Sequence, residues 1–316
     1  MRIGLIDADA ESRGKVTFPN LALMKIAAWH KSRGDTVEWY MPLLSGQMDK
    51  VYVSKVFGDE YTKDYMWPID ADEVVRGGSG YAIRVIDGHE VYDKALDPPL
   101  PPEIECMTPD YSIYEIADTA YGYLTRGCPR GCAFCHVKEM QGRKVHTVAR
   151  LSDFWAGQGK IVLLDPNLTA SRDWDMHIRD LADSGAKVDF SQGLDLRLMT
   201  DAKVATLNRV KWERIHFAWD RPQDDLRGEL VRVMSGLARA RKETITVYVL
   251  TNYDSTHDQD MVRVQAIREA GATPYVMVYR KNTAPRVTRM LQRWCNAPMI
   301  MGACSFDEYV NNGGRV

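Results

Sequence analysis

The chemistry expected of this chain is indicated by one stretch, Tyr123-Leu-Thr-Arg-Gly-Cys128-Pro-Arg-Gly-Cys132-Ala-Phe-Cys135-His136. It places three cysteines in the spacing C-x₃-C-x₂-C, directly after a short apolar run that predicts a strand. Three thiolates on one loop can reach three irons of one cubane cluster, and glycine and proline let such a loop wrap closely around it. The fourth iron would lack a cysteine ligand, and a reactive metal site needs such an open position when a substrate binds the metal directly.

Two other interpretations of these cysteines are a structural zinc site and a set of buried structural thiols. Structural zinc normally takes four ligands in paired spacing, and His136 follows the last cysteine too closely to share its metal. Six cysteines in 316 residues, three of them clustered, indicate metal ligation in a reducing compartment rather than a disulfide framework. We therefore predict a [4Fe–4S] cluster on Cys128, Cys132 and Cys135.

The other three cysteines lie far from this stretch. Cys106 is upstream, and Cys295 and Cys304 are in the C-terminal tail. They are too few and too widely spaced for a second cluster, so we expect buried thiols there.

Apolar runs on both sides of the cysteines predict an α/β fold. A strand at 2–7, a helix at 19–33 and further runs at 37–40, 51–56 and 73–75 predict an open, mostly parallel sheet over residues 1–80. Prolines at 98, 99, 101 and 102 predict a linker over 81–118. Runs at 121–124, 161–164, 187–190, 215–218, 244–250 and 274–279 predict about six βα units over 119–282, as in a partial (β/α)₆ TIM-type barrel. The tail 283–316 is expected to close that barrel.

Charge and hydropathy exclude some classes of protein. Lys plus Arg number 41 and Asp plus Glu 43, giving a net charge of −2, so no global basic field indicates nucleic acid. No run of about 18 apolar residues predicts a membrane span, and the N-terminus lacks a signal-peptide core. A cytoplasmic location is the expectation.

The cysteine spacing, its place after the first strand of a βα series and the order of strands resemble the radical S-adenosylmethionine (SAM) superfamily over residues 119–282. The resemblance implies that the open iron binds the amino and carboxylate groups of SAM's methionine. It also implies reductive cleavage of SAM to a 5′-deoxyadenosyl radical that abstracts hydrogen from a substrate, with methyl or methylthio transfer as variants. An electron donor such as flavodoxin or ferredoxin is implied as a partner. The sequence does not identify the substrate.

The same resemblance suggests contacts with SAM. Phe134 matches an aromatic position that packs near the adenine, although ordinary loop packing also explains it. Asp165 and Asn167, after the second strand, match the position that meets the methionine amino group, and a helix N-cap is the alternative for Asn167. Asp220 matches a ribose contact, and Asn252 lies where relatives support the adenine.

Polar residues after the third strand complete the predicted site. Parallel barrels carry chemistry at the carboxyl ends of their strands, which favours Gln192, Asp195 and Arg197 as active-site residues. Asp195 and Arg197 are separated by one residue, so an extended chain would point both to the same side. Arg197 suits a carboxylate ligand, and a buried structural pair with Asp195 is the alternative.

The first 80 residues resemble, in layout, the Rossmann-like cobalamin-binding domain found in one branch of the family. The loop Asp7–Gly14 lacks the histidine that ligates cobalt there. We therefore expect cobalamin to bind weakly or not at all, and a domain kept for substrate binding or for covering the barrel mouth is the alternative. For the whole chain, the competing class is a non-catalytic iron–sulfur or zinc protein that binds nucleic acid or a protein partner.

Overall fold

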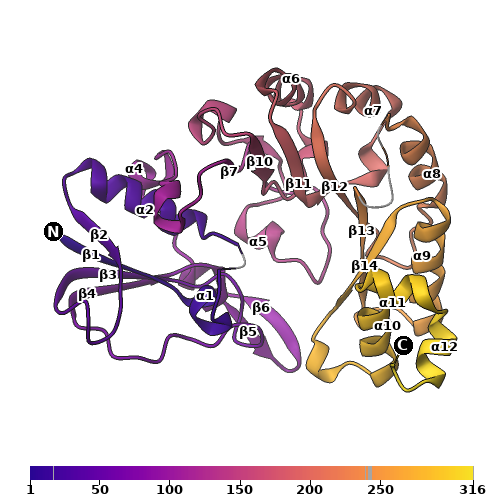
Figure 1. Ribbon diagram of the computed structural model, residues 1–316, viewed down its shortest axis with the longest axis horizontal. Coiled ribbons are helices and arrows are strands. Elements are labelled where there is room, and N and C mark those ends of the chain that lie inside the picture. Colours follow the sequence, from indigo (N-terminus) through magenta and orange to yellow (C-terminus); the bar gives the residue numbers. More distant parts are fainter. Residues whose placement is uncertain (17, 239, 241–243, 316) are drawn as a thin grey trace. The chain divides into compact units, whose positions relative to one another are not determined.

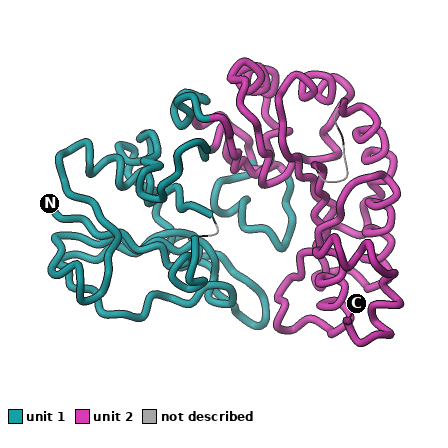
Figure 2. The backbone as a smooth tube through the Cα atoms, viewed as in Figure 1, with its two compact units in different colours: residues 1–122, 130–143, 150–158 teal, residues 123–129, 144–149, 159–316 magenta. Residues whose placement is uncertain are grey.

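The computed structural model describes residues 1–16, 18–238, 240 and 244–315. The chain forms two compact units (Figure 2). Unit 1 comprises residues 1–122, 130–143 and 150–158, and unit 2 comprises 123–129, 144–149 and 159–316. The chain therefore enters unit 2 just before Cys128 and returns to unit 1 twice before remaining in unit 2.

Unit 1 is built on a parallel sheet with the strand order β2-β1-β3-β4. The expected strands of the first 80 residues are all present, as β1 (Arg2–Asp7), β2 (Thr36–Trp39), β3 (Met48–Ser54) and β4 (Ala71–Gly77). Ile3 and Leu5 of β1 pack with Leu23 and Ile26 of helix α2 (Leu21–Ser32), which confirms an α/β arrangement in this part of the chain.

The loop after β1 differs from the expectation based on cobalamin-binding domains. Residues Ala8–Arg13 form a short helix, α1, whose first turn is capped by Asp7 and whose end at Gly14 has a φ of +65°. The Asp9 carboxylate accepts hydrogen bonds from the backbone N–H groups of Val56 and Phe57, and from the Thr62 hydroxyl. The helix is thereby fixed to the segment that follows β3.

Residues 81–118 are part of unit 1 rather than an extended linker. Pro102 starts a helical turn because its fixed φ suits the first helical position, and Ile104 in that turn joins the core with Ile3 and Leu23. The elements of this region are α3 (Ser79–Ala82), β5 (Ile83–Ile86), β6 (His89–Tyr92), η1 (Lys94–Leu96), α4 (Pro102–Glu105) and η2 (Tyr111–Tyr114). Unit 1 also contains β7 (Thr119–Gly122), α5 (Val137–Met140) and η3 (Leu151–Asp153).

Unit 2 contains a parallel sheet with the order β14-β13-β12-β11-β10. Its strands confirm the apolar runs of the sequence: β10 (Lys160–Leu163), β11 (Lys187–Leu194), β12 (Trp212–Ala218), β13 (Ile245–Thr251) and β14 (Thr273–Val278). Among the described residues no pairing of β10 with β14 closes this sheet. A small antiparallel pair, β8 (Thr125–Arg126) with β9 (His146–Thr147), precedes it in the chain.

Helices alternate with the strands of this sheet and lie along one side of it (Figure 1). They are α6 (Trp174–Ser184), α7 (Asp201–Leu207), α8 (Arg227–Gly236) and α9 (His257–Glu269), with short turns η4 (Leu168–Ala170) and η5 (Leu196–Leu198) near the strand ends. On β12, Ile215 and Phe217 are fully buried while His216 between them is half-buried, as the two-residue period of a strand requires.

The C-terminal tail packs on the last strand of unit 2. After η6 (Lys281–Thr283) it forms α10 (Arg286–Cys295), α11 (Pro298–Ala303) and α12 (Phe306–Asn311). Leu291 and Trp294 of α10 and Tyr309 of α12 form a buried cluster with Val276 of β14. Cys295 is fully buried, as expected, but Cys304 is half-buried and Cys106 is exposed. None of the described helices has the length and apolar character needed to cross a bilayer.

Candidate functional site

The three clustered cysteines lie on a loop that the two units share. Cys128 follows β8 directly and belongs to unit 2, whereas Cys132 and Cys135 belong to unit 1, where the Cys135 N–H donates to the Cys132 carbonyl at 3.1 Å. Gly127 has a φ of +90°, a conformation that glycine adopts without steric cost. All three are half-buried thiols, and no disulfide includes them.

The donor set suits an iron–sulfur cluster by its chemistry. Three thiols and no fourth are what a cubane with one open iron requires. Over residues 1–16, 18–238, 240 and 244–315, however, no three His, Cys, Asp or Glu side chains gather closely enough to hold a metal ion. The assignment of Cys128, Cys132 and Cys135 as ligands therefore stays a prediction.

Asp165 fixes the segment that leads into Cys128. Its carboxylate accepts hydrogen bonds from the Leu124 N–H at 3.1 Å, from the Thr125 N–H at 2.5 Å and from the Thr125 hydroxyl at 2.6 Å. The residue is 4% exposed, and burial raises the pKa of its carboxyl to about 6 although these donors favour the charged form. Asp165 thus stabilises the chain before the cysteine loop, a role that its position after a strand did not predict.

Asn167 lies beside Cys128. Its Nδ2 donates to the Cys128 Sγ at 3.5 Å and to the Asp195 Oδ2 at 3.4 Å. The residue is 3% exposed, and its Oδ1 is buried without a hydrogen-bond partner. Asn167 occupies the N-cap position of η4 but its side chain does not cap that turn. The N-cap alternative is therefore wrong for this side chain.

Asp195 and Arg197 are paired with each other. The chain at these residues is not extended, because Asp195 caps the turn η5 and its carboxylate accepts from the Arg197 N–H at 3.2 Å. The Arg197 guanidinium bonds to Asp195 at 3.3 Å and also to Asp224, which the sequence analysis did not select. Arg197 therefore links two carboxylates of the chain, and its neighbours raise the pKa of the guanidinium against the effect of burial. The expectation that an extended chain presents both side chains is wrong.

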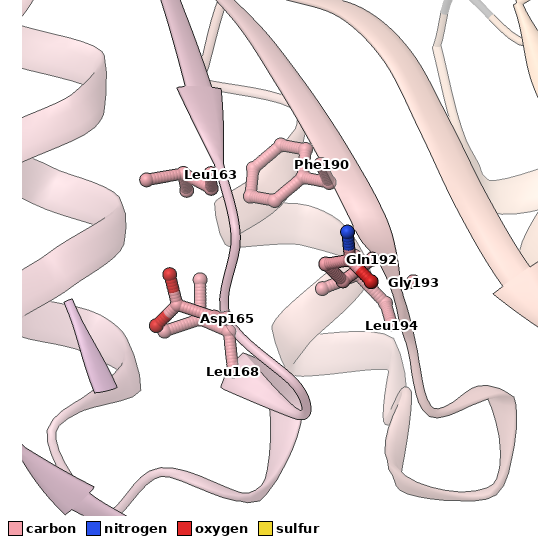
Figure 3. A pocket seen from close by; sticks show the side chains of 7 residues that line it. All are labelled: Leu163, Asp165, Leu168, Phe190, Gln192, Gly193 and Leu194. Carbon is pink, nitrogen blue, oxygen red and sulfur yellow. The ribbon is translucent and has the colours of Figure 1, made fainter. Parts of the chain in front are cut away.

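Gln192 lies within β11 rather than beyond it. The strand continues to Leu194 with an irregular register between Phe190 and Leu194, and Gly193 there has a φ of +100°. Gln192 and Asp165 line one small pocket at the ends of β10 and β11 (Figure 3). Its volume is about 10 Å³, which is the space of a single water molecule. The apolar lining is contributed by Leu163, Leu168, Phe190 and Leu194.

Asp220 follows β12, and its half-buried carboxylate accepts from the Leu250 N–H at 3.2 Å. Burial raises the pKa of this carboxyl to about 6. Arg263 of α9, which is 2% exposed, donates to the carbonyls of Trp219, Asp220 and Leu250 and pairs with Asp260. The ends of β12 and β13 are thus held together by a buried cation.

Asn252 follows β13 and adopts a φ of +62°. Its Nδ2 donates to the Tyr279 carbonyl at 2.7 Å, so the amide links the ends of β13 and β14. This bond gives Asn252 a structural role beside the predicted one.

Phe134 belongs to unit 1, with the second and third cysteines. It lies between these two cysteines in the chain, and its side chain is half-buried. The neighbouring His136 stacks on Tyr92 of β6, with ring centroids 6.1 Å apart, and lies 3.6 Å from the Glu90 carboxylate. The hairpin β5–β6 therefore packs on the cysteine loop within this unit.

Comparison with models of known protein families finds no match, and comparison with curated proteins finds none either.

Within unit 2 the structure brings together Cys128, Asn167, Asp195 and Arg197. Asp220 and Asn252 bond to the Leu250 N–H and the Tyr279 carbonyl, and the charge of Arg197 also acts on the Asp220 carboxyl. Asp224, Thr125 and Arg263 were missed by sequence reasoning. Only Arg263 carried a signal, since an arginine on the buried face of a helix indicates a buried partner.

Proposed function

We propose that this chain is a radical SAM enzyme in which Cys128, Cys132 and Cys135 hold a [4Fe–4S] cluster. The observation that carries the proposal is the C-x₃-C-x₂-C set of thiols at the entry to a parallel α/β unit, with the Leu124–Thr125 segment before it fixed by Asp165. When bound, the cluster would supply the electron that cleaves SAM to a 5′-deoxyadenosyl radical. The partial (β/α)₆ barrel belongs to this proposal, and the alternation of β10–β14 with α6–α9 supports it.

The polar groups at the carboxyl ends of β10 and β12 would contact SAM. Asn167 supports this assignment because its buried Oδ1 has no partner and can accept a hydrogen bond from an ammonium group. Asp220 is the half-buried carboxylate proposed for the ribose, and Phe134 and Asn252 are proposed for the adenine. Gln192 would face substrate. A small one-electron donor such as flavodoxin or ferredoxin would reduce the cluster.

The competing function is a non-catalytic metal protein that binds nucleic acid or a protein partner. Anaerobic reconstitution with iron and sulfide, followed by metal analysis and SAM titration, separates the two. About four irons per chain, cluster spectra that change on adding SAM, and 5′-deoxyadenosine after reduction support the enzyme. One zinc per chain and no response to SAM would contradict it.

Replacing any one of the three cysteines with alanine tests the ligand assignment. Each variant should lose most of its iron and all production of 5′-deoxyadenosine, because two open irons leave the cluster unstable. Cys304→Ala is the matched control, since it removes a half-buried thiol from the tail of unit 2. Full iron content in Cys128→Ala, Cys132→Ala or Cys135→Ala would remove that residue from the ligand set.

A further inference from the structure

The Asn167 amide has only one orientation that its neighbours accept. Its Nδ2 lies 3.5 Å from the Cys128 Sγ and 3.4 Å from the Asp195 Oδ2. An ionised carboxylate only accepts hydrogen bonds, so a flipped amide would place its oxygen against the Asp195 oxygen, and a ligating Cys128 thiolate would likewise only accept. The two N–H donors of the amide are therefore directed at the cysteine and at Asp195, and the carbonyl oxygen is left without a partner.

Asp195 is itself held in place by the chain. Its N–H donates to the Thr169 hydroxyl at 3.0 Å, and its carboxylate accepts from the Arg197 backbone and guanidinium. Arg197 is in turn fixed by Asp224. A relay of four side chains, Asn167–Asp195–Arg197–Asp224, thus ends at the sulfur of Cys128. All four belong to unit 2.

We propose that Asn167 is a positioning residue that donates a hydrogen bond to the Cys128 sulfur and raises the reduction potential of the cluster bound there. The remainder of the relay keeps the donor directed at that sulfur. This inference rests on the proposed function, because it requires a cluster on Cys128. It assigns Asn167 a contact with the protein's own ligand atom, in addition to the proposed contact of its Oδ1 with SAM.

The physical basis is the charge on the sulfur. A donor directed at a ligating thiolate stabilises the more negative, reduced form of a cluster, and hydrogen bonds to the sulfurs are one of the factors that set its potential. Asn167 is only 3% exposed, so water screens its N–H donors little. Arg197 lies between two carboxylates, so the relay carries a net negative charge that alone would lower the potential. Asn167 is the member of the relay whose N–H donates to the sulfur itself.

Redox titration of the reconstituted protein, monitored by electron paramagnetic resonance, tests the inference. Asn167→Leu keeps the size of the side chain and removes both donors. We expect its equilibrium constant for one-electron reduction to fall about tenfold, which corresponds to ~59 mV. Asn167→Asp should fall further because it also adds a negative charge. Asn208→Ala removes another amide of unit 2, one that bonds to Gly236 and Ala238, and should keep the wild-type potential.

The outcomes separate this inference from the proposed function. A wild-type chain that takes up no four-iron cluster overturns the proposed function and the inference with it. A full cluster with the same potential in wild type, Asn167→Leu and Asn167→Asp overturns the inference alone. If neither Asn167 variant holds iron, the melting temperatures of the two variants show whether the loss comes from the site or from the fold. An unchanged melting temperature supports the role of Asn167 in holding the Cys128 sulfur, and a lowered one assigns Asn167 to the fold.

Discussion

The buried carboxylate Asp165 and the half-buried carboxylate Asp220 make the stability of the protein depend on pH. Burial raises the pKa of each carboxyl from 3.8 to about 6. A raised pKa means that the folded state binds the proton more tightly than the unfolded state. The stabilisation is complete below the unfolded pKa and is lost as the pH rises through about 6. For each carboxyl this rise in pKa corresponds to about 3 kcal/mol of stability.

Asp220→Asn isolates one of these contributions. The amide keeps an acceptor for the Leu250 N–H but cannot ionise. Relative to wild type, its free energy of unfolding should be unchanged near pH 4 and higher by about 3 kcal/mol at pH 7. Urea unfolding at several pH values between 4 and 7 measures this difference. Asp183→Asn, which changes an exposed carboxylate of α6, should give no such trend, and a difference independent of pH in Asp220→Asn would contradict the prediction.

Asp195 and Arg197 show why single residues at the site resisted prediction. The sequence correctly marked both as polar residues close to a strand end. Their orientation depends on the turn η5 and on Asp224, which is 27 residues further along the chain than Arg197. Asn167 is a similar case, because nothing in its local sequence indicates that its amide meets Cys128, 39 residues away. Local patterns identify such residues, but contacts across the fold determine what they do.

At the scale of elements, strands and helices followed directly from the sequence. Apolar runs ending at turn residues predicted β1–β4 and β10–β14, because burial of a strand depends on its own side chains. The extent of β11 was underestimated, because Ser191 and Gln192 are polar and Gly193 interrupts the pattern. The pair β8–β9 and the packing of 81–118 were missed, since both depend on residues distant in sequence.

The close contact between α3 and the end of β3 depends on a glycine. A Cβ at Gly80 would lie 2.4 Å from the Phe57 carbonyl oxygen and 2.9 Å from that of Lys55. Backbone atoms cannot move aside as a flexible side chain can. Gly80→Ala should therefore lower the free energy of unfolding by about 1–3 kcal/mol.

Gly77 provides the matched control for this prediction. It is only three positions away, its φ is not positive, and a Cβ there would meet no atom within 4 Å. Gly77→Ala should change stability by no more than about 0.5 kcal/mol. Thermal or urea unfolding of the two variants measures the contrast, and equal stabilities would show that the Gly80 backbone adjusts freely.

At the scale of the whole molecule, the sheet of unit 1 gives a reason to expect little cobalamin binding. Its strand order reverses between β1 and β3, and sheets of this kind bind ligands beyond the carboxyl ends of the strands at such a point. In this chain α1 follows β1 directly, and Asp9 uses the N–H groups of Val56 and Phe57 after β3. These two backbone donors are therefore already engaged.

We accordingly expect protein purified from cobalamin-fed cells to contain far less than one corrin per chain. Cobalt analysis and the visible absorbance of the corrin measure the content. A known cobalamin-binding protein produced in the same cells serves as the control for uptake. One corrin per chain would contradict the prediction and would require that α1 leaves its place after β1.

The hydrogen bonds of Asp165 and Asn167 also impose an order on synthesis at the ribosome. Cys128 leaves the ribosome before Asn167, from which it is separated by 39 positions, and Thr125 is separated from Asp165 by 40. At elongation rates of about 5–20 residues per second, the nascent thiol waits roughly 2–8 s for these partners. During that interval the segment that leads into Cys128 lacks these hydrogen bonds, and the Cys128 thiol is exposed to oxidants. The proposed cluster would meet an anchored Cys128 segment only after residue 167 has emerged.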